Sequence, residues 1–594
     1  MSRKFSVLII GLIGALLLAS CATPTPEVIE KVVTVEKEVE KVITQVVKEM
    51  VKETVIVEGT PQVVEKEVTK IVEKEVTVMV APTFDTTGPK YGGALVYGLS
   101  PGCCRDTMDQ DKSNNTPCRY LGKHVLETLT NVDPATGQIK PGLATSWEVS
   151  EDGLEVTFNL RQGVKFHDGT PFNAEAVKFN FERTMSLPPK AAWQFMAGDK
   201  FKEVQVIDEH TVKLVYNEPH AGLFVMLSDG ALGIDSPAGV EKYGEDYGVK
   251  GLVGSGPFMW VEWVKDDHIT FVRNPDYAWA PEFFDHQGPP YLEEFTCRAL
   301  PEFATLAAAV EIGEIHVARA MEQDAVTFMD MEGFNVKLVP KAGTTRYYMM
   351  NLESPPTDEF AVREAILYAI DKQAIIDTPR FSGIGEPGVA PLPSNMVPGG
   401  VDEFKDLTYP YDPEKSKALL EEAGWVDTDG DGVREKDGQP LQVKFVGSGQ
   451  SDLLFIEPAE GMLSEIGFDV EIVATDFNAW MEAGTTGDFQ LLTMSDSGYE
   501  GPSLLWNFYR SGAPYAFTRL KDDDLDNYLD LAATTMDPEE RWGYVKEAMK
   551  IIVENAATVD VMELMYPFII NDKVQDLWFA ELGFPYAYDA WIKE

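Results

Sequence analysis

The chain has 594 residues, with 50 Lys and Arg against 97 Asp and Glu, so its formal charge at pH 7 is −47. Apolar residues make up 44% and aromatic residues 11%, which is typical of packed domains and excludes a largely disordered chain. A protein this acidic repels a phosphate backbone, so nucleic-acid binding is excluded as a function class. The length suggests about two to four domains.

Residues 1–20 are typical of an export signal. Arg3 and Lys4 are basic, and the apolar stretch 7–18 that follows is too short to span a bilayer. It leads into Leu18-Ala19-Ser20-Cys21, which resembles the bacterial lipobox, where the cysteine carries lipid. An ordinary signal with a chance cysteine is the alternative. We expect lipid on Cys21 to anchor the mature protein at the extracytoplasmic face of the membrane, in the periplasm or at the cell surface.

Residues 21–89 form a linker in which Val, Glu, Lys and Thr dominate, with 8 Lys and 12 Glu between residues 22 and 80. Valines at 3/4 spacing over 32–46 predict a helical stalk or a short coiled coil. Val is a modest helix former and Gly59-Thr60-Pro61 interrupts the pattern, so a poorly ordered spacer fits equally well.

Four cysteines remain in the mature chain: Cys103, Cys104, Cys118 and Cys297. An even number of cysteines in an exported protein predicts disulfides, and three connectivities are open. A bridge between adjacent residues 103 and 104 is strained and therefore disfavoured. A metal cluster is the alternative, but the spacing matches no zinc motif and no histidine lies near. We therefore expect no metal there.

Enzyme signatures are weak. The chain has no phosphate-binding loop of the Walker type, so it is not itself an ATPase. Gly98-Leu99-Ser100-Pro101-Gly102 matches a nucleophile elbow, but the residue after the serine must donate its N–H and Pro101 has none. We expect a protein that is not an enzyme and needs no cofactor.

Residues 427–433 resemble the first seven positions of a calcium loop, with Asp427, Asp429 and Asp431. The twelfth position is Gly438, where such loops place a glutamate. Flanking residues indicate an Asp/Gly-rich hairpin turn, with calcium binding as an open alternative.

The rest of the chain alternates between stretches with the two-residue period of strands and stretches with the 3.6-residue period of helices. Strands are predicted at 156–160, 204–207, 211–215, 441–446 and 469–473. Helices are predicted at 174–185 after Asn173, and at 304–312, 361–370, 416–423 and 454–466. Strands that alternate with helices without an internal repeat indicate an α/β fold with inserted antiparallel pieces.

Six ordered motifs carry a resemblance. They lie at 141–147 with 157–169, at 254–258, at 273–277, at 351 with 362–372, at 411–414 with 422–424, and at 466–470. Over about residues 90–590 the chain resembles the family 5 extracellular solute-binding proteins, the peptide/nickel-type receptors of ABC importers. A departure is His316, where the family usually has Asp.

The resemblance implies an α/β, two-lobe, periplasmic-binding-protein-like (venus-flytrap) fold with an extra third domain, preceded by the signal and the stalk. The implied segments are 90–128, 252–345 and 545–594 for the first lobe, 129–251 for the extra domain and 346–544 for the second lobe. It also implies capture of a solute by lobe closure, followed by delivery to an ABC permease with its ATPase subunits. The classes less favoured are an exported hydrolase and a structural surface lipoprotein.

Ligand identity is less constrained. Peptide binders of this family hold the ligand's amine with Asp in a Trp-x-x-Asp-Tyr-x-x-Pro pattern, and here Ser495 and Gly498 replace the Trp and the Asp while Tyr499 and Pro502 match. Oligopeptides are favoured, with oligosaccharides or metal chelates as alternatives. The ligand-binding residues predicted from the resemblance are Tyr347, Tyr348, Asn351, Trp480, Asp496 and Tyr499.

Overall fold

The computed structural model describes residues 39–57, 60–78, 89–99, 106–113, 115–133, 136–498, 500–580 and 583–593. The chain divides into two compact units, residues 1–88 and 89–594. In the described part, we find no helix with the length and apolar content needed to cross a membrane. The predictions for Cys21, Cys103, Cys104 and Tyr499 lie outside the described residues.

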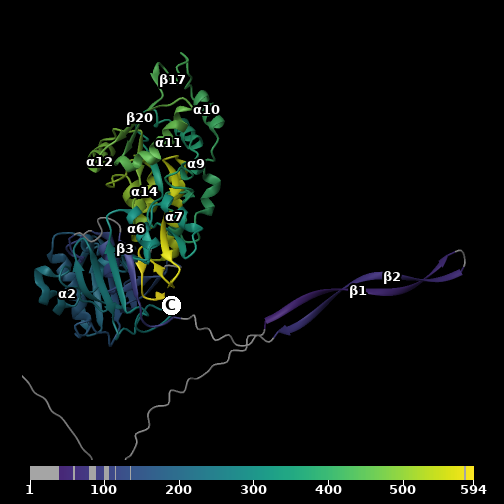
Figure 1. Ribbon diagram of the computed structural model, residues 1–594. Coiled ribbons are helices and arrows are strands. Elements are labelled where there is room, and N and C mark those ends of the chain that lie inside the picture. Colours follow the sequence, from purple (N-terminus) through teal and green to yellow (C-terminus); the bar gives the residue numbers. More distant parts are fainter. Residues whose placement is uncertain are drawn as a thin grey trace, which may run out of the picture. The chain divides into compact units, whose positions relative to one another are not determined.

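The first unit contains a two-stranded antiparallel ribbon, β1 (Val39–Val57) and β2 (Thr60–Val78) (Figure 1). Its register runs from Val39 opposite Val78 to Val57 opposite Thr60. The helical alternative for the stalk is therefore not what the structure has over the described residues. β-Branched Val, Ile and Thr favour extended backbone, which outweighs the 3/4 spacing of the valines.

The second unit contains three larger sheets. The first sheet has seven strands in the order β10-β11-β12-β3-β13-β23-β14. Its strands are β3 (Ala94–Leu99), β10 (Phe258–Val264), β11 (His268–Arg273), β12 (Glu294–Ala299), β13 (Val317–Arg319), β14 (Phe334–Pro340) and β23 (Met565–Asn571). β3 pairs in parallel with β12 and β13, and the other pairs are antiparallel. Helices of this region are α1 (Thr116–Gly122), α6 (Phe303–Glu311) and α7 (Glu322–Met329).

A four-stranded antiparallel sheet, β6-β7-β9-β8, lies within residues 144–216. Its strands are β6 (Ala144–Val149), β7 (Glu155–Leu160), β8 (Phe201–Asp208) and β9 (Thr211–Tyr216), with the pair β4 (Thr130–Val132) and β5 (Ile139–Pro141) nearby in sequence. The helices here are α2 (Ala174–Ser186), α3 (Ala191–Phe195), α4 (Leu223–Met226), α5 (Pro237–Tyr243), and the 3-10 turns η1 (Gly230–Leu232) and η2 (Gly244–Asp246). Asn173 caps α2 through its side chain, as predicted.

The second large sheet has six strands in the order β16-β22-β15-β21-β19-β20. Its strands are β15 (Arg346–Met350), β16 (Glu386–Pro387), β19 (Gln442–Gly447), β20 (Asp469–Ala474), β21 (Leu491–Met494) and β22 (Thr558–Glu563). The helices are α8 (Phe360–Ala369), α9 (Lys372–Ile376), α10 (Pro413–Glu422), α11 (Leu453–Ser464), α12 (Phe477–Thr486), α13 (Gly501–Tyr509), α14 (Asp523–Thr534) and α15 (Pro538–Glu554), with η3 (Ser394–Met396), η4 (Asp402–Leu407) and η5 (Gln450–Asp452).

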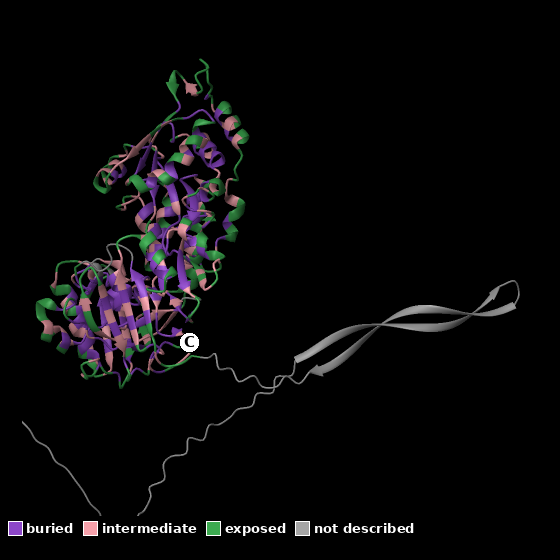
Figure 2. Ribbon diagram, in the orientation of Figure 1, coloured by how far each residue is buried: buried purple, intermediate pink, exposed green. Residues whose placement is uncertain are grey.

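Short hairpins complete the unit: β17 (Glu435–Lys436) with β18 (Gln439–Pro440), β24 (Val574–Gln575) with β27 (Trp591–Ile592), and β25 (Trp578–Phe579) with β26 (Pro585–Tyr586). Buried residues concentrate in the strands of the sheets, and exposed residues occur mainly on helices and turns (Figure 2). The core of the six-stranded sheet has two faces, because Tyr348 and Met350 pack in one cluster while Tyr347 and Met349 pack in another.

The chain crosses between the two large sheets twice. The first crossing lies between β14 and β15, and the second lies between β22 and β23 at Leu564. The second crossing comes later than the expected boundary at 544 and 545. β22 pairs with β15 and β16, which holds it in the six-stranded sheet.

Candidate functional site

The two crossing segments run side by side. The main-chain N–H of Lys341 donates to the carbonyl oxygen of Leu564 at 2.8 Å. The loop that follows β21, residues 495–498, contacts the first crossing segment at Lys341 and Thr344. The elements that join the sheets and the loop that replaces the family's amine-binding pattern are therefore in contact.

The loop is held mainly by its backbone. The Asp496 N–H donates to Thr344 Oγ1 at 2.9 Å, and the Thr344 N–H donates to the Asp496 carbonyl oxygen at 3.1 Å. Gly343 permits this approach: its φ is +139°, and a Cβ there would lie 2.1 Å from the Asp496 carbonyl oxygen. The Asp496 side chain itself is exposed. A carboxylate presented in this way can accept a charged hydrogen bond from an amine.

Lys341 adds a side-chain contact to the same loop. Its Nζ donates to Ser495 Oγ at 2.9 Å and to the Asp496 carbonyl oxygen at 2.8 Å, and only 5% of the residue is exposed. Burial lowers the pKa of Lys341 to about 7; Asp496 opposes this shift, whereas Arg346 and Arg319 add to it. The loop is therefore held by hydrogen bonds from a lysine whose burial disfavours its charged form.

Four of the residues predicted to bind ligand are buried in the region of the second large sheet. Tyr347 and Tyr348 lie on the central strand β15 and are 0% exposed. Tyr348 Oη donates to the Phe455 carbonyl oxygen at 2.6 Å, Asn351 Nδ2 to the carbonyls of Gly487 and Phe489 at 3.1 Å each, and Trp480 Nε1 to the Thr493 carbonyl at 3.2 Å. The polar groups of Tyr348, Asn351 and Trp480 are thus used within the protein, and a role of the four residues in ligand binding stays a prediction. Asp496 is the predicted site residue that the structure leaves exposed among those it describes.

Cys118 and Cys297 are both buried in one hydrophobic cluster of the first sheet. Cys118 carries a free thiol in this structure. Because Cys103 and Cys104 lie outside the described residues, the pairing of the four cysteines stays a prediction.

The region of the four-stranded sheet touches the region of the six-stranded sheet near the end of the same loop. The Ala221 N–H donates to the Ala533 carbonyl oxygen at 3.2 Å. Next to it, Glu500 caps α13 and forms a buried ion pair with Arg541 at 2.7 Å. Burial lowers the pKa of the neighbouring His220 to about 4. His220 is therefore neutral at physiological pH.

The acidic loop forms a turn ahead of the β17–β18 hairpin, as expected from its sequence. Carboxylate oxygens of Asp427, Asp429, Asp431 and Glu435 come within 4.8 Å of one another on an exposed surface. Asp427 accepts hydrogen bonds from the N–H groups of Gly430 and Gly432 at 2.6 and 3.1 Å. These amides stabilise the turn without an ion, and calcium binding stays an open alternative.

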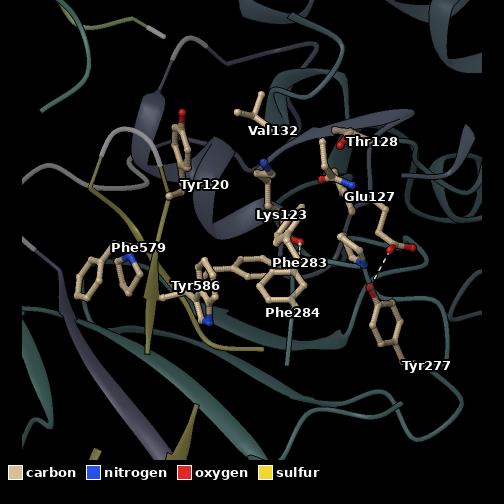
Figure 3. A pocket seen from close by; sticks show the side chains of 16 residues that line it. Tyr120, Lys123, Glu127, Thr128, Val132, Tyr277, Phe283, Phe284, Phe579 and Tyr586 are labelled. Carbon is tan, nitrogen blue, oxygen red and sulfur yellow. Dashed lines mark hydrogen bonds between the residues drawn. The ribbon is translucent and has the colours of Figure 1, made fainter. Parts of the chain in front are cut away.

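A separate small cavity opens beside the crossing segments (Figure 3). Tyr120 belongs to its wall and also packs against Ala342 of the first crossing. The remaining wall comes from the segment after α1, from residues 277–284 and from the C-terminal hairpin β25–β26.

Residues 138–515 match the family model described as bacterial extracellular solute-binding proteins, family 5 middle. The chain belongs to this family. The prediction made from the sequence motifs is thereby confirmed. A glutathione-binding protein, GsiB, of Salmonella typhi is 29% identical over 464 residues, which cover 75% of this chain and 84% of that protein. Its counterpart in Escherichia coli K12 is 27% identical over 478 residues, covering 77% and 86%.

Solved structures show the same fold as this solute-binding protein. NikA of Brucella suis, in complex with Fe(III)-EDTA, has a TM-score of 0.70 at 23% identity and covers 82% of this chain and 97% of that one. DppA of Helicobacter pylori, in complex with the peptide STSA, has a TM-score of 0.64 at 24% identity, covering 85% and 99%. HbpA2 of Haemophilus parasuis reaches 0.73 at 22% identity, covering 84% and 100%. The mixed α/β, periplasmic-binding-protein fold predicted from the sequence is confirmed.

Sequence reasoning missed Lys341 and Gly343. No motif includes them, and their role depends on a loop that lies more than a hundred residues later. Gly343 itself was a usable signal, because glycine is typical of positions where another part of the backbone approaches closely.

Proposed function

We propose that this solute-binding protein captures short peptides or peptide-like solutes beside the crossing segments and delivers them to an ABC permease with its ATPase subunits. The observation that carries the proposal is the loop 495–498, whose backbone is fixed by Thr344 and Lys341 while the Asp496 carboxylate is exposed. A peptide amine is the complementary group. The relatives that bind glutathione and the DppA structure with a bound peptide support the same ligand class.

Ligand capture needs no chemistry on the ligand. A solute that binds better to one arrangement of the two sheets shifts the equilibrium toward it, and the crossing segments are the natural place for such a hinge. The permease would then distinguish loaded from empty protein. A protein that only captures the solute, while the permease transports it, needs neither a catalytic residue nor a cofactor, and we expect neither in this chain.

A second candidate ligand is a metal chelate, which the likeness to the NikA structure with Fe(III)-EDTA favours. Thermal unfolding of the purified protein with glutathione, trialanine, Fe(III)-EDTA and maltotriose separates the classes, because a ligand bound only by the folded state raises the midpoint. We expect glutathione or trialanine to raise it. A shift with Fe(III)-EDTA or maltotriose alone would replace the peptide proposal by a chelate or an oligosaccharide one.

The lipid anchor at Cys21 is part of the proposal, and residues 22–89 separate it from the receptor in the sequence. Cys21→Ala is expected to release the protein from isolated membranes into the soluble fraction, with peptide binding unchanged. Membrane association that persists in this variant would refute the anchor and leave the ligand proposal standing.

A further inference from the structure

Each of the two large sheets places an arginine at the edge where its parallel strands end. Arg319 is the last residue of β13, which runs parallel to β3. Arg346 is the first residue of β15, which pairs antiparallel with β21, so it lies beside the end of β21 where the loop 495–498 begins. β21 is in turn parallel to β19. Ligands of α/β folds bind outside the carboxyl ends of parallel strands, so both arginines lie at the edge that favours a ligand.

Arg319 has no acidic partner among the described residues. Its guanidinium lies over the ring of Tyr566, 3.6 Å from the ring centroid, and the residue is partly exposed. Its Nε is buried and has no hydrogen-bond partner in the part of the chain that the structure describes. Glu322, at the start of the helix that follows β13, is paired with Arg380 instead. The charge of Arg319 is therefore not balanced by a carboxylate.

Arg346 has a partner that is shared with other donors. Its Nη2 donates to the buried carboxylate of Asp452, which also accepts from the Ser448 N–H at 2.8 Å and from Thr493 Oγ1. The Nε of Arg346 is buried and, within the described ranges, has no hydrogen-bond partner. Arg346 thus keeps a donor without an acceptor.

Lys341 is the third cation of this place. Its Nζ donates only to neutral oxygen atoms of the loop, Ser495 Oγ and the Asp496 carbonyl. Burial contributes most to its lowered pKa, and the charges of Arg346 and Arg319 lower it further, so the two arginines lie close to the lysine. In a chain with a net charge of −47, this is a local excess of positive charge. A bound anion would balance it.

The number of unbalanced cations sets how many acidic groups the solute can bring. A peptide such as trialanine carries one carboxylate, at its C-terminus. Arg319 and Lys341 are two cations without a carboxylate partner among the described residues, and Arg346 shares its partner. The site therefore has room, in charge, for a second carboxylate.

We propose that the solute is an acidic short peptide, and that Arg319, together with Lys341 and Arg346, binds its acidic side chain while Asp496 binds its amine. This inference rests on the proposed function and narrows its ligand class from short peptides to acidic ones. Arginine suits this role, because its planar guanidinium can donate two parallel hydrogen bonds to one carboxylate. The amine and the acid of the solute are then held by different residues, so their contributions can be measured separately.

Calorimetric titration of the purified full chain with Glu-Ala-Ala, Ala-Glu-Ala and Ala-Ala-Glu, each beside its Gln counterpart, tests the inference. The two members of a pair have almost the same size and differ in one charge. We expect at least one Glu peptide to bind about tenfold or more tightly than its Gln counterpart, because a charged hydrogen bond is gained. Scanning the three positions covers the different orientations of the acid relative to the amine.

Substitutions assign the preference to Arg319. Arg319→Met should lower the affinity for the preferred Glu peptide to about that of its Gln counterpart and leave the Gln peptide unchanged, whereas Arg319→Lys keeps the charge and should keep part of the preference. Arg319→Gln replaces the methionine variant if that variant does not fold. Arg510→Met is the matched control, because it removes the same charge from an exposed pair with Asp530 and should change no affinity.

The outcomes separate this inference from the proposal on which it rests. Asp496→Asn should weaken the Glu and the Gln peptide alike and preserve their ratio. Equal affinity within every Glu/Gln pair would refute the acidic ligand class and leave the peptide proposal standing, whereas binding by none of the six peptides would refute both. A preference for the Glu peptide that survives in Arg319→Met, or that Arg510→Met abolishes as well, would overturn the assignment to Arg319.

Discussion

The ammonium group of Lys341 is bonded to the main chain of Asp496, with 2.8 Å between Lys341 Nζ and the Asp496 carbonyl oxygen. Lys341 belongs to the first of the two segments that cross between the large sheets. Asp496 follows β21, a central strand of the six-stranded sheet. The position of the Asp496 carboxylate therefore depends on how the two sheets are joined. A change at the crossing is expected to reach the ligand through this bond.

The first prediction concerns Asp496 as the partner of a peptide amine. Asp496→Asn is expected to weaken trialanine binding by about 1.5–3 kcal/mol, because a charged hydrogen bond is replaced by a neutral one. Calorimetry measures the difference. Asp488→Asn, a change at the exposed ion pair with Lys444, is the control and should leave binding unchanged.

Trp480→Ala separates the sugar alternative from the peptide reading. Trp480 is 4% exposed, so its truncation is expected to lower the free energy of unfolding by about 3–5 kcal/mol through the cavity it leaves. If the folded variant loses maltotriose binding while Asp496→Asn retains it, the ligand is a sugar and the peptide assignment fails. If neither change weakens binding of any probe, the ligand lies elsewhere.

The second prediction concerns Gly343. Gly343→Ala is expected to lower the free energy of unfolding by about 1–3 kcal/mol and to weaken trialanine binding, because its Cβ would displace the Asp496 carbonyl. Gly333 gives a matched control: its φ is also positive, at +91°, but a Cβ there meets nothing within 4 Å. Gly333→Ala should cost stability only. Equal affinity of Gly343→Ala and Gly333→Ala for trialanine would contradict the proposal that the first crossing segment positions the loop 495–498.

The third prediction concerns the buried pair of Glu500 and Arg541, whose side chains are 8% and 9% exposed. Arg541→Leu leaves a buried carboxylate without its partner and should lower the free energy of unfolding by about 3–5 kcal/mol in urea titrations. Adding Glu500→Gln should recover part of that loss. Arg510→Leu breaks the more exposed pair with Asp530 and should cost less than about 1 kcal/mol. Similar losses for the two arginines would show that burial does not set the cost.

The fourth prediction concerns pH and Glu127, whose folded pKa is raised by burial from 4.5 to about 7. Between these values the folded state holds a proton that the unfolded state has lost, so the free energy of unfolding falls as the pH rises from 4.5 to 7. Glu127 accounts for a fall of about 3 kcal/mol in the free energy of unfolding over this pH range. Glu127→Gln should remove that part of the slope and match the unchanged protein best below pH 5. Parallel pH profiles for the two proteins would contradict the shift.

The fifth prediction concerns the cysteines. Cys103, Cys104, Cys118 and Cys297 are expected to be largely disulfide-bonded after export, because thiols oxidise outside the cytoplasm. Thiol titration of the denatured, unreduced mature protein measures this. Four reactive thiols would disprove the pairing, and the free Cys118 thiol of the present structure would then describe the exported protein as well.

Local sequence signals predicted much of this molecule. Asn173 starts α2 and Gly424, at φ +91°, follows α10, because an N-cap acceptor and a left-handed residue act within one helical turn. The strands at 156–160 and 211–215 are present as β7 and β9. The ordered motifs were sufficient to assign the family.

Only the tertiary structure decided which side chains are available to a ligand. Tyr347 and Tyr348 have the chemistry of a binding site, yet β15 lies between β22 and β21 with a hydrophobic cluster on each face, so both rings are buried. Lys341 reaches Asp496 across 155 positions of the chain. Sequence by itself determined several helices and strands of the second unit and the family, since these follow from patterns within short stretches of the chain. The sites depend on contacts between distant segments, and packing alone decides those.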